Sequence, residues 1–147
     1  MTKKKLMIAG ALGAALCAAA AGGAAWAHHA FAAEFDGKAP VLLRGKVTRV
    51  EWINPHAWVH IKDNATGQAW MVEGGTPNTL LRSGIDRNSL KPGTEIIVRG
   101  YQSKDKLCRP ACKANGRDVT FPDGKKLFMG SSGTGAPSDG SDPTERK

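Results

Sequence analysis

Residues 56–73 decide the fold, and they read His56-Ala-Trp-Val-His-Ile-Lys-Asp63, Asn64-Ala-Thr-Gly67 and Gln68-Ala-Trp-Met-Val-Glu73. Apolar and polar side chains alternate in the two outer segments, which is typical of strands with one buried face. The middle segment has the composition of a tight turn, so the whole stretch predicts a β-hairpin. If Asp63 pairs with Gln68, the buried face carries two cross-strand pairs, Val59 with Val72 and Ile61 with Trp70.

The opposite face of this predicted hairpin gathers side chains that can bind ligands. In the same register it carries Trp58 opposite Glu73 and His60 opposite Met71, with His56 at the open end. Imidazole, thioether and carboxylate groups are metal ligands, and an indole ring offers a flat surface to a sugar. The face is therefore a candidate metal site or oligosaccharide site. The alternative is a half-exposed surface on which Trp58 serves only as a packing lid.

Further strands are expected on both sides of the hairpin. Val41–Trp52 is rich in β-branched residues and ends before the turn-favouring pair Asn54-Pro55. After the hairpin, Thr76 is a suitable N-cap and Pro77 a suitable first helical residue, so a short helix should run to Ser83. The remaining strands are expected at 94–102, 118–121 and 126–128, and the last two are expected as one strand or as a hairpin. The cysteine loop and a turn at Asn115-Gly116 are expected between 94–102 and 118–121.

This order of elements predicts a mainly β fold. Three strands, a short helix and two more strands match a small OB-like five-stranded barrel with one short helix between the third and fourth strands. A β-sandwich is the rival architecture, but it needs about seven strands.

The two ends of the chain have compositions unlike the rest. Residues 1–27 begin with three lysines, continue with an apolar Ala- and Gly-rich stretch, and close on Ala25-Trp-Ala27, which together predict a secretory signal peptide. An uncleaved membrane anchor is the alternative. Residues 130–147 are rich in Gly, Ser and Pro and are expected to be a disordered tail. The folded domain is therefore expected at residues 28–129, in the periplasm or secreted.

Cleavage of the signal would lower the formal net charge of the chain from +8 to +5. A moderately basic exported domain does not indicate nucleic-acid binding. No stable membrane span is expected after cleavage.

Two cysteines remain after cleavage, Cys108 and Cys112, because Cys17 lies in the signal. An even pair in an oxidising compartment predicts a disulfide. Five fully extended residues would hold the two sulfur atoms too far apart, so the segment must curl. A metal site built on two thiolates is the alternative.

The predicted mature amino terminus suggests a copper site. Cleavage after Ala27 exposes His28, whose amine and ring are two nitrogen ligands on one residue. A third nitrogen from His56 would give the T-shaped set of a histidine brace, which suits Cu(II). His60 with Met71 is a softer alternative set, suited to Cu(I). Cleavage after Ala32 would remove His28 and with it the brace.

Several short motifs together resemble the domain-of-unknown-function family 6152 of small exported bacterial proteins. They are Ala27-His-His-Ala-Phe31, Glu34-Phe-Asp36, Gly45-Lys-Val47, Glu51-Trp52, Asn54-Pro-His56, Arg87-Asn-Ser-Leu-Lys-Pro-Gly93 and Asp123-Gly-Lys-Lys-Leu-Phe128. The resemblance spans His28 to Gly130 and implies an exported single domain with no established activity. The segment between the two cysteines looks like an addition to the family's pattern.

The sequence favours a binding or accessory domain over an enzyme, because it contains no evident nucleophile–base pair, phosphate loop or catalytic carboxylate pair. We expect an exported domain that binds copper through an N-terminal histidine. The alternatives are a small-ligand or oligosaccharide-binding OB-like module using Trp58, and a structural accessory of an exported enzyme or envelope complex.

Overall fold

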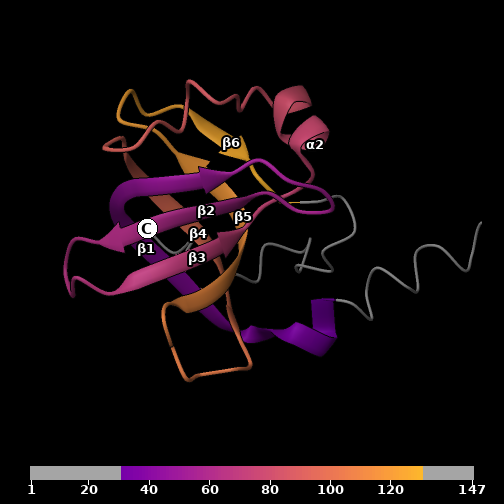
Figure 1. Ribbon diagram of the computed structural model, residues 1–147, viewed down its shortest axis with the longest axis vertical. Helices are drawn as coiled ribbons and strands as arrows, with labels where there is room; N and C mark the ends of the chain where they lie inside the picture. The colour runs from indigo at the N-terminus through magenta and orange to yellow at the C-terminus, as the bar shows by residue number, and fades with distance from the viewer. Residues whose placement is uncertain (1–30, 131–147) are drawn as a thin grey trace, which may run out of the picture.

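The computed structural model describes residues 31–130 of the chain (Figure 1). The predicted signal peptide, His28 and the predicted C-terminal tail lie outside the described residues, apart from Gly130. Within residues 31–130, no helix is both long enough and apolar enough to cross a membrane.

Residues 31–130 form a mainly β fold with six strands and two short helical segments. The strands are β1 (Phe35–Glu51), β2 (Trp58–Asp63), β3 (Ala69–Glu73), β4 (Glu95–Ser103), β5 (Cys112–Thr120) and β6 (Lys126–Phe128). Helix α2 (Pro77–Arg82) follows β3, and a single helical turn at residues 31–34 precedes β1. Residues 31–130 contain one strand more than the five predicted, because the C-terminal hairpin contributes two separate strands.

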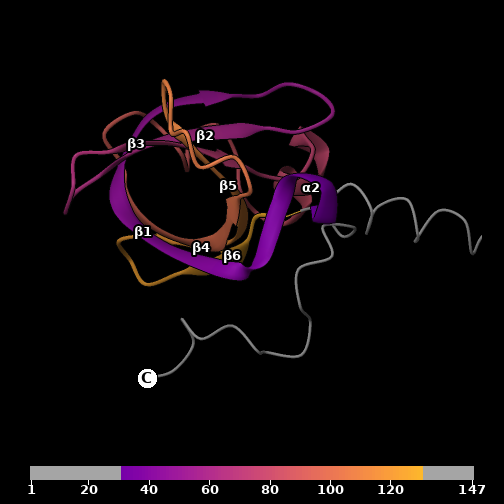
Figure 2. The ribbon, with the colours of Figure 1, turned by 90° about the horizontal axis from the view of Figure 1, so that it is seen from below.

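The strands form one sheet that closes into a ring. Neighbouring strands follow the order β3-β2-β1-β4-β5-β6, and β3 also pairs with β5 in parallel orientation. That pairing joins the two sides of the sheet and leaves β6 attached to β5 outside the ring. Figure 2 looks along the ring, whose interior is filled by core side chains.

The β2–β3 hairpin has the predicted register. Asp63 N–H donates to the Gln68 carbonyl at 3.0 Å, and the turn lies between them. The paired residues are Val59 with Val72, Ile61 with Trp70, His60 with Met71 and Trp58 with Glu73. Val59, Ile61 and Val72 are buried in the core, and Trp70 is partly buried against it, so the predicted inner face of the hairpin is confirmed.

Helix α2 begins and ends close to its predicted bounds. The Thr76 hydroxyl accepts a hydrogen bond from the Thr79 N–H at 3.1 Å, which satisfies one of the free donors of the first turn. Pro77 is the first helical residue, where a missing N–H is harmless. Leu80 is the buried residue that packs this helix onto the core.

The largest error of the sequence prediction concerns β5. Asn115 and Gly116 were expected in a turn, but they lie in the middle of this strand. Gly116 is required there because a Cβ atom would come within 2.8 Å of Met129 Sδ and of a Val72 methyl group. The strand exists because β3 and β4 both pair with it, and such pairing leaves no local signal in the sequence.

The first residues of two strands differ from the prediction. β2 begins at Trp58, so His56 lies in the connection before the strand and not within it. β1 begins at Phe35, well before the predicted Val41, because its first half pairs with β4.

Candidate functional site

Four side chains from four neighbouring strands form a row on the outer face of the sheet. Pairing aligns Tyr101 of β4 with Asn115 of β5, Asn115 with Glu73 of β3, and Glu73 with Trp58 of β2. Successive side chains of a strand point to opposite faces, so this row lies opposite the buried face that carries Val72. We call Tyr101, Asn115, Glu73 and Trp58 the outer row.

The first described residues cover one end of the outer row. Phe31 stacks edge-on against Tyr101 with ring centroids 5.8 Å apart, and it lies beside Phe35 at the same separation. The Glu34 carbonyl accepts the Lys104 backbone N–H at 2.9 Å, and the Ala32 carbonyl accepts the Lys104 ammonium. These contacts bury Phe31, Phe35 and Tyr101, which form a cluster separate from the core inside the ring.

His56 lies beside the Glu73 carboxylate of the outer row. Nδ1 of His56 lies 3.7 Å from Oε1 of Glu73, and it is a buried atom with no hydrogen-bond partner among residues 31–130. The His56 side chain is nevertheless 37% exposed, whereas the Glu73 side chain is only 11% exposed. The imidazole is therefore partly accessible although its Nδ1 is buried.

The backbone holds this arrangement in place. Ala57 N–H donates to the Gly75 carbonyl at 3.0 Å, and Gly74 N–H donates to the Ala57 carbonyl at 2.8 Å. These two hydrogen bonds tie the residue after His56 to the residues after Glu73. The connection before β2 is thereby fixed against the end of β3.

Asn115 supports the Glu73 carboxylate from β5. Its Nδ2 donates to Oε1 of Glu73 at 3.3 Å. Its Oδ1 is buried and finds no hydrogen-bond partner within the described part of the chain. The cluster therefore contains an acceptor atom whose hydrogen-bonding capacity is not used by residues 31–130.

Burial raises the pKa of the Glu73 carboxyl above its ordinary value of 4.5. His56 and the Asn115 amide act to lower this pKa, while the nearby Glu34 carboxylate raises it further. Desolvation dominates because the covered outer row excludes water from the carboxylate.

Glu73→Gln is expected to raise the unfolding free energy near pH 7. A carboxyl group whose pKa is higher in the folded protein than in the unfolded chain destabilises the fold once it is ionised. The wild-type protein should gain stability as the pH falls from the raised value towards 4.5, so the difference between the two proteins should narrow there. Urea unfolding near pH 7 and near pH 4.5 measures the difference in unfolding free energy between the two proteins. A variant less stable than wild type near pH 7 would contradict the argument.

His60 is engaged in a separate polar network on β1 and β2. Its Nε2 lies 2.9 Å from Oε1 of Glu51 and 3.1 Å from a guanidinium nitrogen of Arg49. Arg49 and Glu51 also form an ion pair at 2.6 Å. Met71 is half-buried and aligned with His60, but this network occupies one of the two His60 ring nitrogens.

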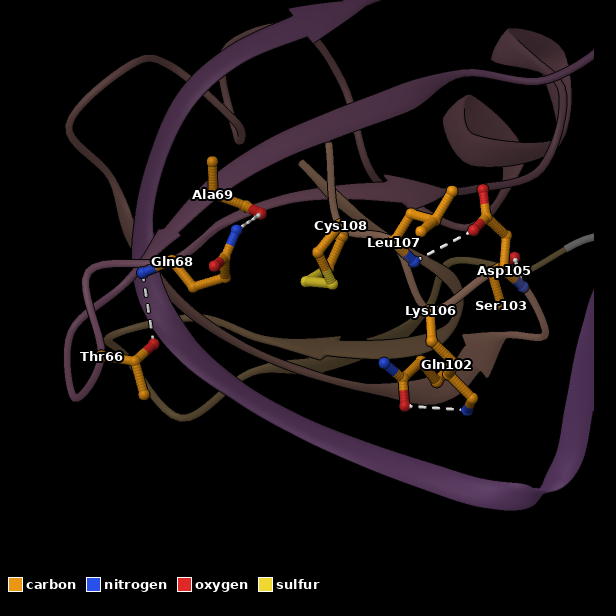
Figure 3. The surroundings of a disulfide bond; sticks show 10 residues. Thr66, Gln68, Ala69, Gln102, Ser103, Asp105, Lys106, Leu107 and Cys108 are labelled. Carbon is orange, nitrogen blue, oxygen red and sulfur yellow. Dashed lines mark hydrogen bonds between the residues drawn. A yellow bond between two sulfur atoms is a disulfide. The ribbon is translucent and has the colours of Figure 1, made fainter. Parts of the chain in front are cut away.

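Cys108 and Cys112 are joined by a disulfide in the β4–β5 connection (Figure 3). Cys112 opens β5 and is aligned with Trp70 of β3, so the bridge ties the loop to the parallel pair that closes the ring. Sulfur atoms in a disulfide are not thiolates, and this bonding state excludes the thiolate metal site.

The structure thus brings together His56, Glu73 and Trp58 and leaves His60 with Met71 on a neighbouring patch. His28 lies outside the described residues. Sequence reasoning missed Asn115, Glu34 and Tyr101, whose positions depend on β5 and on the covering turn. Within residues 31–130, no three His, Cys, Asp or Glu side chains are grouped so that they could hold a metal ion.

The chain matches the family of unknown function 6152 over residues 15–109 and belongs to it. The match includes the segment with His28, His56 and Glu73 and stops before Cys112. The Asp123–Phe128 motif, which also suggested the family, lies beyond the matched residues. No curated protein matches the chain, and no solved structure matches it.

Proposed function

We propose that this chain is an exported binding or accessory domain that binds one copper ion. The ligands are the amine and ring of His28 and the ring of His56. Three nitrogen donors in a tetragonal arrangement favour Cu(II). The observation that carries the proposal is the His56 ring, which is 37% exposed although its Nδ1 is buried beside a carboxylate.

The position of Phe31 supports the participation of His28. Phe31 packs on Tyr101 at the end of the outer row, and Glu34 is close enough to Glu73 to affect its pKa. Three residues span at most about 11 Å. The distance between His28 and Phe31 therefore cannot exceed this length.

We also propose that the ring formed by β1, β2, β3, β5 and β4 is an OB-like barrel, with α2 between its third and fourth strands. Barrels of this type bind ligands on the face of the second and third strands and on the adjacent loops. His56 lies in the β1–β2 connection and Glu73 ends β3, which is consistent with such a binding face.

The test is a copper titration of the exported protein after its intact mass has been measured. The mass should correspond to a start at His28; a start at Ala33 or an uncleaved chain would overturn the proposal. One extra residue before His28 displaces the amine without removing a side chain. It should weaken copper binding by at least about 100-fold, more than the loss of an outer-shell group usually does.

His56→Ala should weaken copper binding to a similar extent, and His60→Ala should leave it unchanged. Unchanged affinity after the N-terminal extension would show that the brace is wrong. A silent His56→Ala together with an effect of His60→Ala would place copper on the patch with Met71 instead.

A further inference from the structure

We infer that the Cys108–Cys112 bridge is a site of thiol–disulfide exchange with a dithiol, and that its opening releases the connection between β4 and β5 while the sheet stays intact. The sulfur atom attacked by the dithiol is Sγ of Cys108. This role goes beyond the proposed function and is independent of it, since it involves neither His28 nor His56.

The bridge lies in an exposed and irregular part of the chain (Figure 3). Residues 104–111 form neither helix nor strand, most of them are exposed, and Leu107 directly before the bridge is 75% exposed. Cys108 is half-buried, whereas Cys112 is the first residue of β5 and only 4% exposed. A thiolate that approaches from solvent is therefore expected to attack Cys108, with Cys112 as the leaving group.

The backbone at Cys108 has an unfavourable conformation. Its φ is 49°, and within residues 31–130 it is the only residue other than glycine with a positive φ. A Cβ atom disfavours the left-handed region, and such conformations persist only where the surrounding structure enforces them. The disulfide joins Cys108 to the start of β5, so opening it lets this residue leave the left-handed region. Strained or exposed disulfides are the ones that are reduced most readily.

Positive charge predominates in the chain around the bridge. Residues 104–113 carry four basic side chains and one acidic side chain. Arg109 lies between the two cysteines, and Lys113 directly follows the second one. Nearby cations stabilise thiolates, and a better stabilised thiolate is a better leaving group. The composition of this connection therefore favours exchange.

The sheet does not need the bridge for its strand pairing. β5 pairs with β3 from Cys112 to Asn115, and Gln102 near the end of β4 is aligned with Ala114 of β5. The bridge joins residues only four positions apart. It therefore restricts the unfolded chain much less than a bridge that closes a long loop. Reduction should release residues 104–111 and leave the domain folded.

The exchange takes two steps. A thiolate of the dithiol attacks Sγ of Cys108 and forms a mixed disulfide, while the bond between the two cysteine sulfurs breaks and its electron pair goes to Sγ of Cys112. The second thiolate of the reductant then attacks the reductant sulfur of the mixed disulfide, and Cys108 leaves as a thiolate. The dithiol is oxidised to a disulfide, and its two electrons and two protons are found on the two cysteine thiols.

The first experiment compares reduction of the native and the unfolded protein. The exported protein is incubated with dithiothreitol in metal-free buffer, with and without concentrated urea, and is then quenched with acid and alkylated. Mass spectrometry of the tryptic peptide Leu107–Lys113 follows both cysteines of the bridge and excludes Cys17. The native rate should lie within about 10-fold of the rate in urea, as for an accessible disulfide. A larger protection would identify a structural bridge and overturn the inference.

The second experiment locates the attacked sulfur with glutathione, a monothiol that stops at the mixed disulfide. Rapid quenching and alkylation should place the adduct on Cys108, and an adduct on Cys112 would overturn the assignment. Circular dichroism and urea unfolding of the reduced protein should show a retained sheet and a cooperative transition. Loss of the sheet on reduction would overturn the release of residues 104–111 as a local event.

Arg109→Gln tests the contribution of charge, with Lys125→Gln as the matched control. Lys125 is an exposed basic residue in the turn between β5 and β6, away from the bridge in the chain. Arg109→Gln should slow reduction by dithiothreitol at low salt by about 2–5-fold, the range that one exposed charge contributes. Lys125→Gln should leave the rate unchanged. Equal rates for both variants would contradict the stabilisation of the leaving thiolate by Arg109.

Discussion

Asp118→Ala is expected to lower the unfolding free energy by about 3–5 kcal/mol, the range measured when one partner of a buried ion pair is removed. Arg99 of β4 donates through Nε and Nη2 to the two carboxylate oxygens of Asp118 in β5, at 2.9 and 2.8 Å. Their side chains are only 11% and 8% exposed. Removing the carboxylate leaves the guanidinium buried without this bidentate partner.

The pair of Lys46 and Glu95 is the control for Asp118→Ala. It also joins two adjacent strands, β1 and β4, but its side chains are exposed and its atoms are 3.6 Å apart. Glu95→Ala should cost no more than about 1 kcal/mol. Urea unfolding of both variants measures the contrast, and similar losses would contradict the importance of burial.

Ile61→Ala is expected to cost about 2–5 kcal/mol, as for other large-to-small core substitutions. Ile61 is buried in the ring interior, opposite Trp70 and against Gly45. Gly45 lies against Ile61 and has no side chain that could move into the vacated space. The cavity should therefore persist.

Denaturant unfolding of Ile61→Ala, beside Ile53→Ala, gives the measurement. Ile53 is an exposed residue of the β1–β2 connection, so its truncation should change stability by no more than about 0.5 kcal/mol. A loss below about 1 kcal/mol for Ile61→Ala would show that the ring interior is loosely packed there.

The β2–β3 hairpin could be predicted from the sequence because the residues that determine it are close together in the chain. Alternation fixes which side chains face the core, and the Asn64–Gly67 turn fixes the register, so Val59 and Val72 were paired correctly. Helix α2 was predicted for a similar reason, since the Thr76 cap and Pro77 act within one turn.

Strand β5 could not be predicted because its stability comes from its partners. Its sequence, Cys112-Lys-Ala-Asn-Gly-Arg-Asp-Val-Thr120, is polar and contains a typical turn pair. Asn115 and Gly116 adopt strand geometry because β3 and β4 supply hydrogen bonds on both sides. Tertiary pairing here overrides local preference.

The candidate site was predictable only in part. The register placed Glu73 and Trp58 on one face and His56 near them, as the structure has it. The burial of Glu73 was not foreseen, because Glu73 lies beside Asn115 of β5, a strand that the sequence did not predict.

Closure of the ring has a consequence for the order of folding. Phe35 pairs with Ser103 and Trp70 with Cys112, so the sheet depends on contacts between distant parts of the chain. Proteins dominated by such contacts fold in about milliseconds to seconds, whereas an isolated hairpin forms in about 1–10 μs. Glu73 and Asn115 belong to the parallel pair that closes the ring. The β2–β3 hairpin needs only local contacts, whereas the supported carboxylate beside His56 also needs the pairing of β3 with β5.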